Sequence, residues 1–320
     1  MQRSFKDYLL ITLKGIAMGA ADVVPGVSGG TIAFISGIYE ELISTIDNFN
    51  FSAFKKIKKE GFKSVWKQLN GNFLLSLFIG IFISILSLAK LIKWLLENKP
   101  LLLWAFFFGL VIASIFIISK SISKWTIPVF IFIIIGTIIS YYVTILEPTK
   151  SPDSFYYLFF CGFLAIIAMI LPGISGAFIL VLLGAYETAI HTVNLFIESV
   201  IEMNFAKFSD AILKIISLAL GALLGLKIFS KILNWMFTHK KNITLAVLIG
   251  FMIGSLNKIW PWKKTITWYT NSHNVKVPLL QHSILPNKYE GDPQLMYTII
   301  FALLGFLTIF LIEKVASRKQ

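Results

Sequence analysis

A glycine-rich break occurs twice in this chain, each time inside apolar sequence. Residues 25–40 read PGVSGGTIAFISGIYE and residues 172–187 read PGISGAFILVLLGAYE, with eight of sixteen positions identical at an offset of 147. Further similarity follows at an offset of 141, where Gly80, Lys90, Trp94, Gly109 and Ser114 recur as Gly221, Lys231, Trp235, Gly250 and Ser255. Such self-similarity predicts two homologous halves, 1–148 and 149–320.

Apolar runs of membrane-spanning length follow each break. The chain is 57% hydrophobic and only 14% charged, whereas soluble chains carry about 25% charged residues. About 20 apolar residues cross a hydrocarbon core. We therefore predict an all-α polytopic membrane protein with one integral membrane domain and about three membrane-spanning helices in each half. The predicted helices are 73–96, 101–119 and 126–146 in the first half, and 211–236, 242–256 and 295–315 in the second.

Each break is flanked by apolar segments that are too short to cross comfortably, of about sixteen residues each, against the 20 or so needed. Proline removes a backbone donor and glycine favours irregular backbone, which membranes tolerate where it is buried in protein. The sequence therefore predicts two re-entrant helical hairpins, 6–46 and 156–193. The alternative is that both flanking segments span fully, which gives ten crossings in all.

Either count gives an odd number of crossings per half, which predicts that the second half is inverted relative to the first. Charge supports this: loop 51–72 is rich in lysine, whereas its equivalent, 197–210, is mainly acidic. Because lysine and arginine favour the cytoplasmic face, these loops are expected on opposite faces. Both termini are then cytoplasmic and the loop 257–294 is extracytoplasmic. Inverted repeats with broken helices are typical of secondary transporters.

The break itself favours anion binding, because a helix N-terminus has unpaired N–H groups and a partial positive charge. The alternative is that the serines cap their helices and the glycines permit close packing. The first copy is the stronger candidate, since Ala177 and Phe178 replace Gly30 and Thr31 in the second. The predicted phosphate-binding residues are Gly26, Ser28, Gly29, Gly30, Thr31, Gly173, Ser175 and Gly176.

Three acids are candidates for proton coupling or gating. Glu40 and Glu187 are equivalent positions, whereas Asp22 just precedes the first break and has Met169 as its counterpart. Ionisable groups at membrane depth are costly and point to function. The alternatives are solvation at the interface for the glutamates and a local backbone hydrogen bond for Asp22.

Cationic contacts to an anion would have to come from lysine, because the two arginines of the chain, Arg3 and Arg318, lie near its termini. Lys14 and Lys227 are the candidates within apolar segments, although a single lysine often extends to the headgroups instead. The single cysteine excludes a Cys-based metal site. No metal or cofactor is predicted.

The chain resembles the PopT family of polyprenyl-phosphate transporters. The resemblance rests on GAADVVPGVSGGTIAFISGIYEELI at 19–43, on LPGISGAFILVLLGAYE at 171–187, and on the membrane pattern over nearly the whole chain. It implies a flippase in the bacterial cytoplasmic membrane that returns undecaprenyl phosphate from the outer to the cytoplasmic leaflet for cell-envelope glycan synthesis. Polyprenyl phosphate and anionic lipids are the expected partners, nucleic acid is not, and a homodimer is left open.

Two other classes of function were weighed. A small-anion or ion channel or secondary transporter of the same architecture would use the same helix ends. A lipid phosphatase would need a nucleophile or base beside strong phosphate ligands, and the four histidines and two arginines offer no such cluster. We therefore predict a transporter and no enzyme.

Overall fold

The computed structural model describes residues 3–24, 27–49, 61–149, 152, 154–202, 205–270 and 276–317. The first half contains α1 (Phe5–Asp22), α2 (Gly29–Ile35), α3 (Tyr39–Asn48), α5 (Phe62–Gln68), α6 (Gly71–Asn98), α7 (Pro100–Ser119) and α8 (Ile127–Ile145). The second contains α9 (Phe155–Ile170), α10 (Gly176–Leu182), α11 (Tyr186–Ile201), α12 (Phe205–His239), α13 (Lys241–Ser255), β1 (Lys263–Thr270), β2 (Lys276–Ser283), the 3-10 turn η1 (Pro286–Lys288) and α14 (Leu295–Ser317).

The described residues are mostly helical, as expected for a polytopic membrane protein. Four of the described helices, α6, α7, α8 and α12, are long and apolar enough to cross a membrane, and a fifth span results if α10 and α11 are counted as one bent unit. The apolar helices α9 and α13 and the apolar part of α14 are shorter, at 10–17 residues. Six full crossings were expected after the hairpins; of those six segments, α13 falls short of this length at 15 residues, and the apolar part described for α14 covers 17 of its 23 residues.

The second arm of each hairpin is itself interrupted, which the sequence analysis did not predict. Gly37 follows α2 and Gly184 follows α10, both with positive φ, +74° and +65° respectively. These two glycines are also 147 positions apart, and only glycine adopts this backbone readily. The axes of α10 and α11 differ by 104° as a result.

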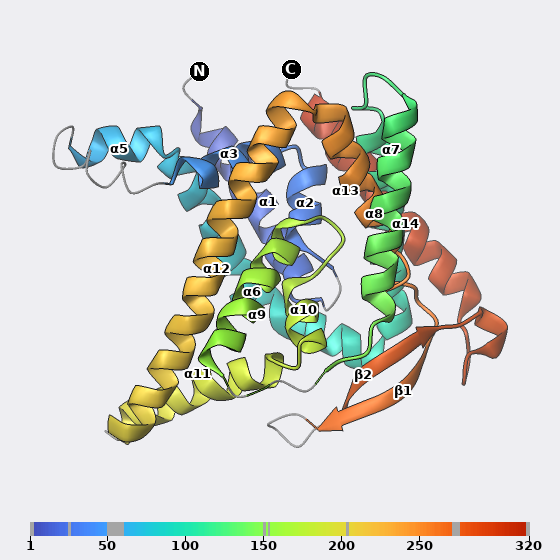
Figure 1. Cartoon of the computed structure of the whole chain (residues 1–320). Helices are drawn as coiled ribbons and strands as arrows, with labels where there is room; N and C mark the ends of the chain where they lie inside the picture. The colour runs from blue at the N-terminus through green and yellow to red at the C-terminus, as the bar shows by residue number, and fades with distance from the viewer. Residues whose placement is uncertain are drawn as a thin grey trace.

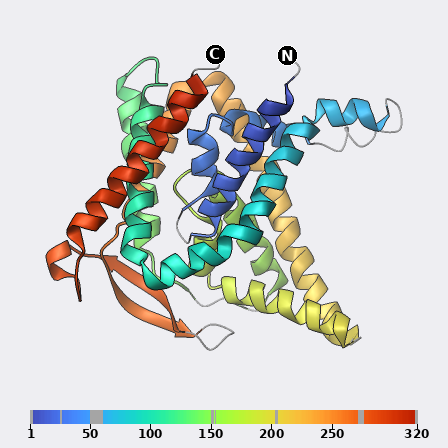
Figure 2. The ribbon, with the colours of Figure 1, turned by 180° about the vertical axis from the view of Figure 1, so that it is seen from behind.

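Helices α1 and α9 run toward the middle of the molecule from opposite ends (Figures 1 and 2). Both termini, α3 and the α7–α8 and α12–α13 connections lie at one end, and α11 and the β-hairpin lie at the other (Figure 1). Helices α2 and α10 extend from the central breaks back toward these two ends. The breaks are thereby placed at mid-height, surrounded by the long helices.

Glycine permits four close helix crossings, which form two pairs related by the sequence repeat. At each crossing a Cβ on either glycine would overlap a backbone carbonyl oxygen of the partner helix. Within the halves, α1 crosses α6 and α9 crosses α12, whereas α7 crosses α14 and α8 crosses α13 between the halves. The glycines are Gly15 with Gly80, Gly162 with Gly221, Gly109 with Gly305, and Gly136 with Gly250.

A two-stranded antiparallel sheet, β1 with β2, lies in the segment between α13 and α14. This segment was expected to be a loop of an all-α protein, so the hairpin is an addition to the predicted fold. The β1 sequence KKTITWYT is rich in β-branched and aromatic residues, which favour strands. Two tryptophans fix its base: the indole N–H of Trp260 donates to the Ile284 carbonyl at 2.8 Å, and that of Trp262 to the Pro293 carbonyl at 2.9 Å.

Candidate functional site at the two helix breaks

The two breaks contact each other through hydrogen bonds between the halves. The Ser28 hydroxyl donates to the Met169 carbonyl at 3.0 Å, and the Gly173 N–H donates to the Thr31 hydroxyl at 2.9 Å. The buried Tyr39 hydroxyl donates to the Ile170 carbonyl at 3.0 Å. Carbonyls at the end of α9, which have no partner within their own helix, are thereby satisfied by side chains of the first hairpin.

At the first break, the N–H groups at the start of α2 are already paired. The Asp22 carboxylate accepts from the Gly29 N–H at 2.6 Å, and the Ser28 hydroxyl, at the N-cap, accepts from the Gly30 N–H at 3.1 Å. The Thr31 N–H donates to the Ser28 carbonyl at 2.9 Å. An internal carboxylate therefore takes the place in which an anionic ligand was expected.

Three of the predicted glycines are required by space. A Cβ at Gly29 would overlap the Asp22 carboxylate, and one at Gly30 or Gly176 would lie 2.6 Å from a carbonyl oxygen of α9. These glycines let the short helices pack directly on backbone, as the packing alternative in the sequence analysis supposed. The remaining predicted glycine of the first copy, Gly26, lies outside the described residues.

The second break is arranged differently. Ser175 is the N-cap of α10, but its side chain makes no capping hydrogen bond. It lines a cavity of about 10 Å³, together with Gly173, Phe178 and Lys258, which is room for about one water molecule. The Lys258 ammonium lies 4.0 Å from the centre of the Phe178 ring. A cation and a free hydroxyl thus face the same small cavity.

The two copies differ in which of their polar groups are already paired. The substitution of Thr31 by Phe178 in the second copy suggested a weaker anion site, yet Phe178 is the ring on which Lys258 rests. In the first copy Thr31 is occupied by the Gly173 N–H and the helix start by Asp22. The cavity at the second break therefore offers the more accessible polar groups.

The structure separates the two glutamates from the breaks. Glu40 lies at the start of α3, is half-exposed, and forms an ion pair of 2.7 Å with Lys241. Glu187 lies at the start of α11 and is exposed, as is His191 one turn later. Of the three candidates for proton coupling, Asp22 is the one in contact with a break.

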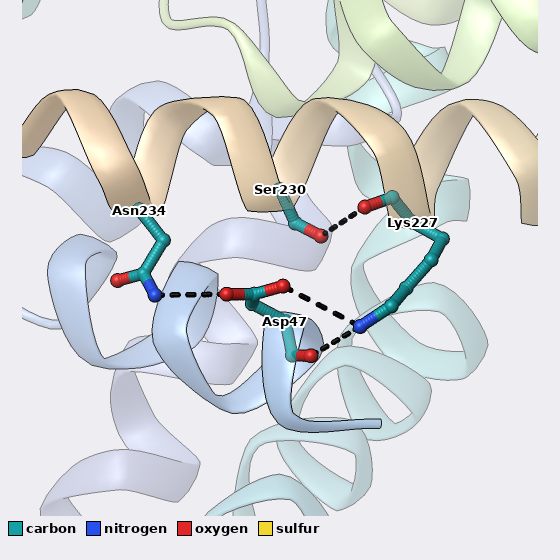
Figure 3. Close-up of polar contacts among 4 residues, drawn as sticks. All are labelled: Asp47, Lys227, Ser230 and Asn234. Atoms are coloured by element: carbon teal, nitrogen blue, oxygen red, sulfur yellow. Dashed lines mark hydrogen bonds and ion pairs between the residues drawn. The ribbon is translucent and has the colours of Figure 1, made fainter. Parts of the chain in front are cut away.

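The two predicted lysines have other partners. Lys14 donates to the Ser36 carbonyl at 2.6 Å, at the C-terminal end of α2, where a cation suits the helix dipole. Lys227 on α12 binds the carboxylate and backbone carbonyl of Asp47 on α3, and Asn234 donates to the same carboxylate at 2.9 Å (Figure 3). Lys227 therefore joins the first hairpin to the second half.

Lys258 is the site residue that sequence reasoning missed. It follows α13 in the run NKIWPWKK, which holds three lysines and no acid. That run lies between a membrane helix and a strand, and the sequence alone does not distinguish its lysines from other loop lysines. Its tryptophans were the available signal, because they anchor the segment against the membrane helices.

Comparison with known proteins links this arrangement to one family. Residues 18–277 match the family described as undecaprenyl phosphate translocase-like. A polyprenyl-phosphate transporter of Vibrio cholerae is 41% identical over 316 residues, which are 98% of either chain. One of Staphylococcus aureus is 33% identical over 273 residues, 81% of this chain and 89% of its own length. No solved structure matches the chain.

Proposed function

Because the chain belongs to the undecaprenyl phosphate translocase-like family, we propose that it is a transporter of undecaprenyl phosphate and not an enzyme. In this proposal the lipid moves from the outer to the cytoplasmic leaflet of a bacterial cytoplasmic membrane and so becomes available again for cell-envelope glycan synthesis. The single observation that carries the mechanism is the contact between two broken helices at mid-height, seen in the bond from Gly173 N–H to Thr31.

The architecture in this proposal is a pair of inverted repeats with re-entrant hairpins. Helices α1 and α9, which run inward from opposite ends (Figure 1), support it, and so do the equivalent glycine crossings of the two halves. Both termini and the α7–α8 and α12–α13 connections lie at one end of the molecule (Figure 1). These connections contain basic residues, among them Lys120, Lys124 and Lys240, which suits a cytoplasmic face. The β-hairpin then lies on the extracytoplasmic face.

A polar path at mid-height lowers the main free-energy barrier to transport, which is the transfer of a charged phosphate through hydrocarbon. Moving an ionised phosphate through hydrocarbon without compensation is strongly unfavourable. Serine and threonine hydroxyls and helix-start N–H groups at the breaks can replace part of its hydration. The outward faces of α6, α8 and α12 expose many apolar side chains, so the isoprenoid tail can stay in the lipid while the headgroup crosses.

Asp22 supplies the proton coupling in this mechanism. While ionised, its carboxylate competes with a phosphate for the Gly29 N–H. When Asp22 takes up a proton, it loses its negative charge, and the start of α2 becomes available to the lipid phosphate. Loss of the proton returns the carboxylate and expels the phosphate. One proton would thus be taken up each time the N–H groups at the start of α2 become available to the phosphate.

Reconstituted vesicles test the function directly. Labelled undecaprenyl phosphate is placed in one leaflet, and its transfer is measured together with ion flux. Transfer that requires the protein, without ion flux, supports the proposal. Rapid ion flux without lipid transfer would instead indicate the channel alternative, and release of inorganic phosphate from the lipid would indicate a phosphatase.

A further inference from the structure

Two lysines without an ion pair among the described residues, Lys258 and Lys263, lie five positions apart in the segment that leads from α13 into β1. Lys263, at the start of β1, has a buried ammonium group with no hydrogen-bond partner among the residues that the structure describes. This group lies 3.4 Å from the centre of the Trp104 ring, on α7. Lys258 rests on the Phe178 ring at 4.0 Å and lines the cavity at the second break.

Burial lowers the pKa of both lysines. Burial lowers the pKa of Lys258 to about 8. The pKa of Lys263 is lowered well below its ordinary value by burial and, in addition, by the charge of Lys258. Buried ammonium groups are normally paired with a carboxylate or another acceptor, and neither lysine has an ion pair within the described ranges. A contact with an aromatic ring offsets only part of this cost.

The segment that carries both lysines is held rigidly. Asn257 donates to the Thr144 hydroxyl at 2.7 Å, and its own carbonyl accepts from the Ser283 hydroxyl at 2.9 Å. The Trp260 ring packs against Phe108 on α7, with ring centres 5.2 Å apart. Because this backbone is fixed before any ligand arrives, little ordering cost is left for binding.

We propose that Lys258 and Lys263 form a receiving site for the phosphate monoester group of the lipid, beside the second break and on the extracytoplasmic side. The site rests on the proposed function and adds the residues that collect the substrate. A phosphate monoester carries about two negative charges at neutral pH, so it can pair with an ammonium group that has no acidic partner within the described residues. The Ser175 hydroxyl, in the same cavity as Lys258, is the next donor along the path to the centre.

The site also explains a difference between the two ends of the molecule. The residue equivalent to Lys258 in the first half is Ile117, at the same offset of 141. The first half therefore has no counterpart of Lys258 at this position of the repeat. Such an asymmetry favours uptake from the leaflet next to the β-hairpin.

The test is equilibrium binding of undecaprenyl phosphate to the purified full-length protein in nanodiscs of neutral lipid, at pH 7. Lys258→Gln and Lys263→Gln are each expected to weaken binding by about tenfold, the scale of a charge-assisted hydrogen bond. The double variant is expected to weaken it further. Lys264→Gln is the matched control, because Lys264 is adjacent, exposed and paired with Glu290 at 3.0 Å, and its binding should be unchanged.

Further arms identify the ligand group and guard against misfolding. Undecaprenol, which lacks the phosphate, should bind equally to all variants. Binding of inorganic phosphate is measured separately. If the lysine variants weaken binding of both inorganic phosphate and the lipid, the site recognises phosphate from either source. If they weaken binding of the lipid alone, the site is specific for the lipid headgroup. Lys258→Arg keeps the charge and should retain binding, while Lys263→Met should fold with an unchanged or higher melting temperature.

Equal lipid binding by the wild type and the folded double variant would overturn the receiving site. Leaflet transfer by the wild type is measured on the same preparations. Wild type that neither binds nor transfers the lipid contradicts the proposed function itself. If the wild type binds and transfers the lipid and the double variant binds it equally well, only the receiving site is contradicted.

Discussion

The Asp22 carboxylate accepts a 2.6 Å hydrogen bond from the backbone N–H of Gly29, seven residues later in the chain. A larger residue at position 29 would displace the carboxylate, since its Cβ would overlap the Asp22 side chain. The pair closes the first break with an acid of the protein itself. Any anion that binds at the start of α2 must displace this group.

Asp22→Asn is therefore expected to uncouple transport from protons. The amide oxygen can still accept from Gly29, so the break should keep its shape, but the side chain no longer titrates. Leaflet transfer is measured in vesicles with and without a pH gradient. We expect transfer by the variant to be insensitive to the gradient, and transfer by the control Glu187→Gln, which changes an exposed acid, to respond as wild type does. A full response in Asp22→Asn would remove this residue from the coupling.

Thr31→Val is expected to destabilise the contact between the breaks. The Thr31 hydroxyl is the acceptor for the buried Gly173 N–H, and an unpaired buried donor costs about 1–3 kcal/mol. Thermal unfolding measures the loss, and Thr31→Ser should restore most of it. Ser175→Ala is the contrasting variant: its hydroxyl makes no capping bond, so stability should be unchanged while lipid binding falls. Equal melting temperatures for Thr31→Val and wild type would contradict the assigned role.

Much of this arrangement could be predicted from the sequence, because it depends on local rules. Apolar runs of membrane length predicted the helical class, and the two Pro-Gly breaks predicted where α1 and α2, and α9 and α10, are separated. The interruption at Gly37 was missed, since one glycine within an apolar run is not by itself a break. The strands β1 and β2 were missed because their pairing depends on anchoring by Trp260 and Trp262.

The site was predicted less well, because its partners come from distant parts of the chain. Asp22 makes the local backbone bond that was one of its alternatives, and its role in proton coupling stays a prediction. Lys258 was not identified, since only the fold brings it to Ser175 and Phe178. Lys227 was correctly placed in an apolar helix, but its partner Asp47, 180 positions away, could not be read from either segment alone.

Asp47→Asn is expected to loosen α3 from α12. The carboxylate binds both Lys227 and Asn234 (Figure 3), and these are contacts between the first hairpin and the second half. Because the pair is partly exposed, the loss should be modest, about 1 kcal/mol. Hydrogen exchange at the amides of α3 should accelerate by up to about tenfold. Lys241→Gln, which removes the half-exposed pair with Glu40, is the control and should change exchange much less. Unchanged exchange in both variants would show that Asp47 does not hold the hairpin.

The low pKa of Lys258, about 8, predicts how binding and stability depend on pH. Its ordinary value is 10.5, so between these values the folded protein holds fewer protons than the unfolded chain, and stability of the ligand-free protein should rise with pH. Affinity for undecaprenyl phosphate should fall by up to about tenfold from pH 7 to pH 9, because the lysine loses its charge while the phosphate is already doubly ionised. Titration calorimetry at the two pH values measures this, and Lys258→Gln should flatten it. Equal wild-type affinities would contradict the prediction.

The glycine crossings have a consequence for the origin of such a chain. Helices α7 and α8 of the first half do not cross each other closely; each takes its glycine partner from the second half, α14 and α13. If the first half were expressed alone, the glycine surfaces of α7 and α8 would have no helix packed against them. Two copies of one ancestral half could have packed these helices against each other in the same way, as an interlocked homodimer. A gene duplication would then have joined the two copies in one chain. The present protein should accordingly assemble from co-expressed fragments 1–148 and 149–320, but not from either fragment alone.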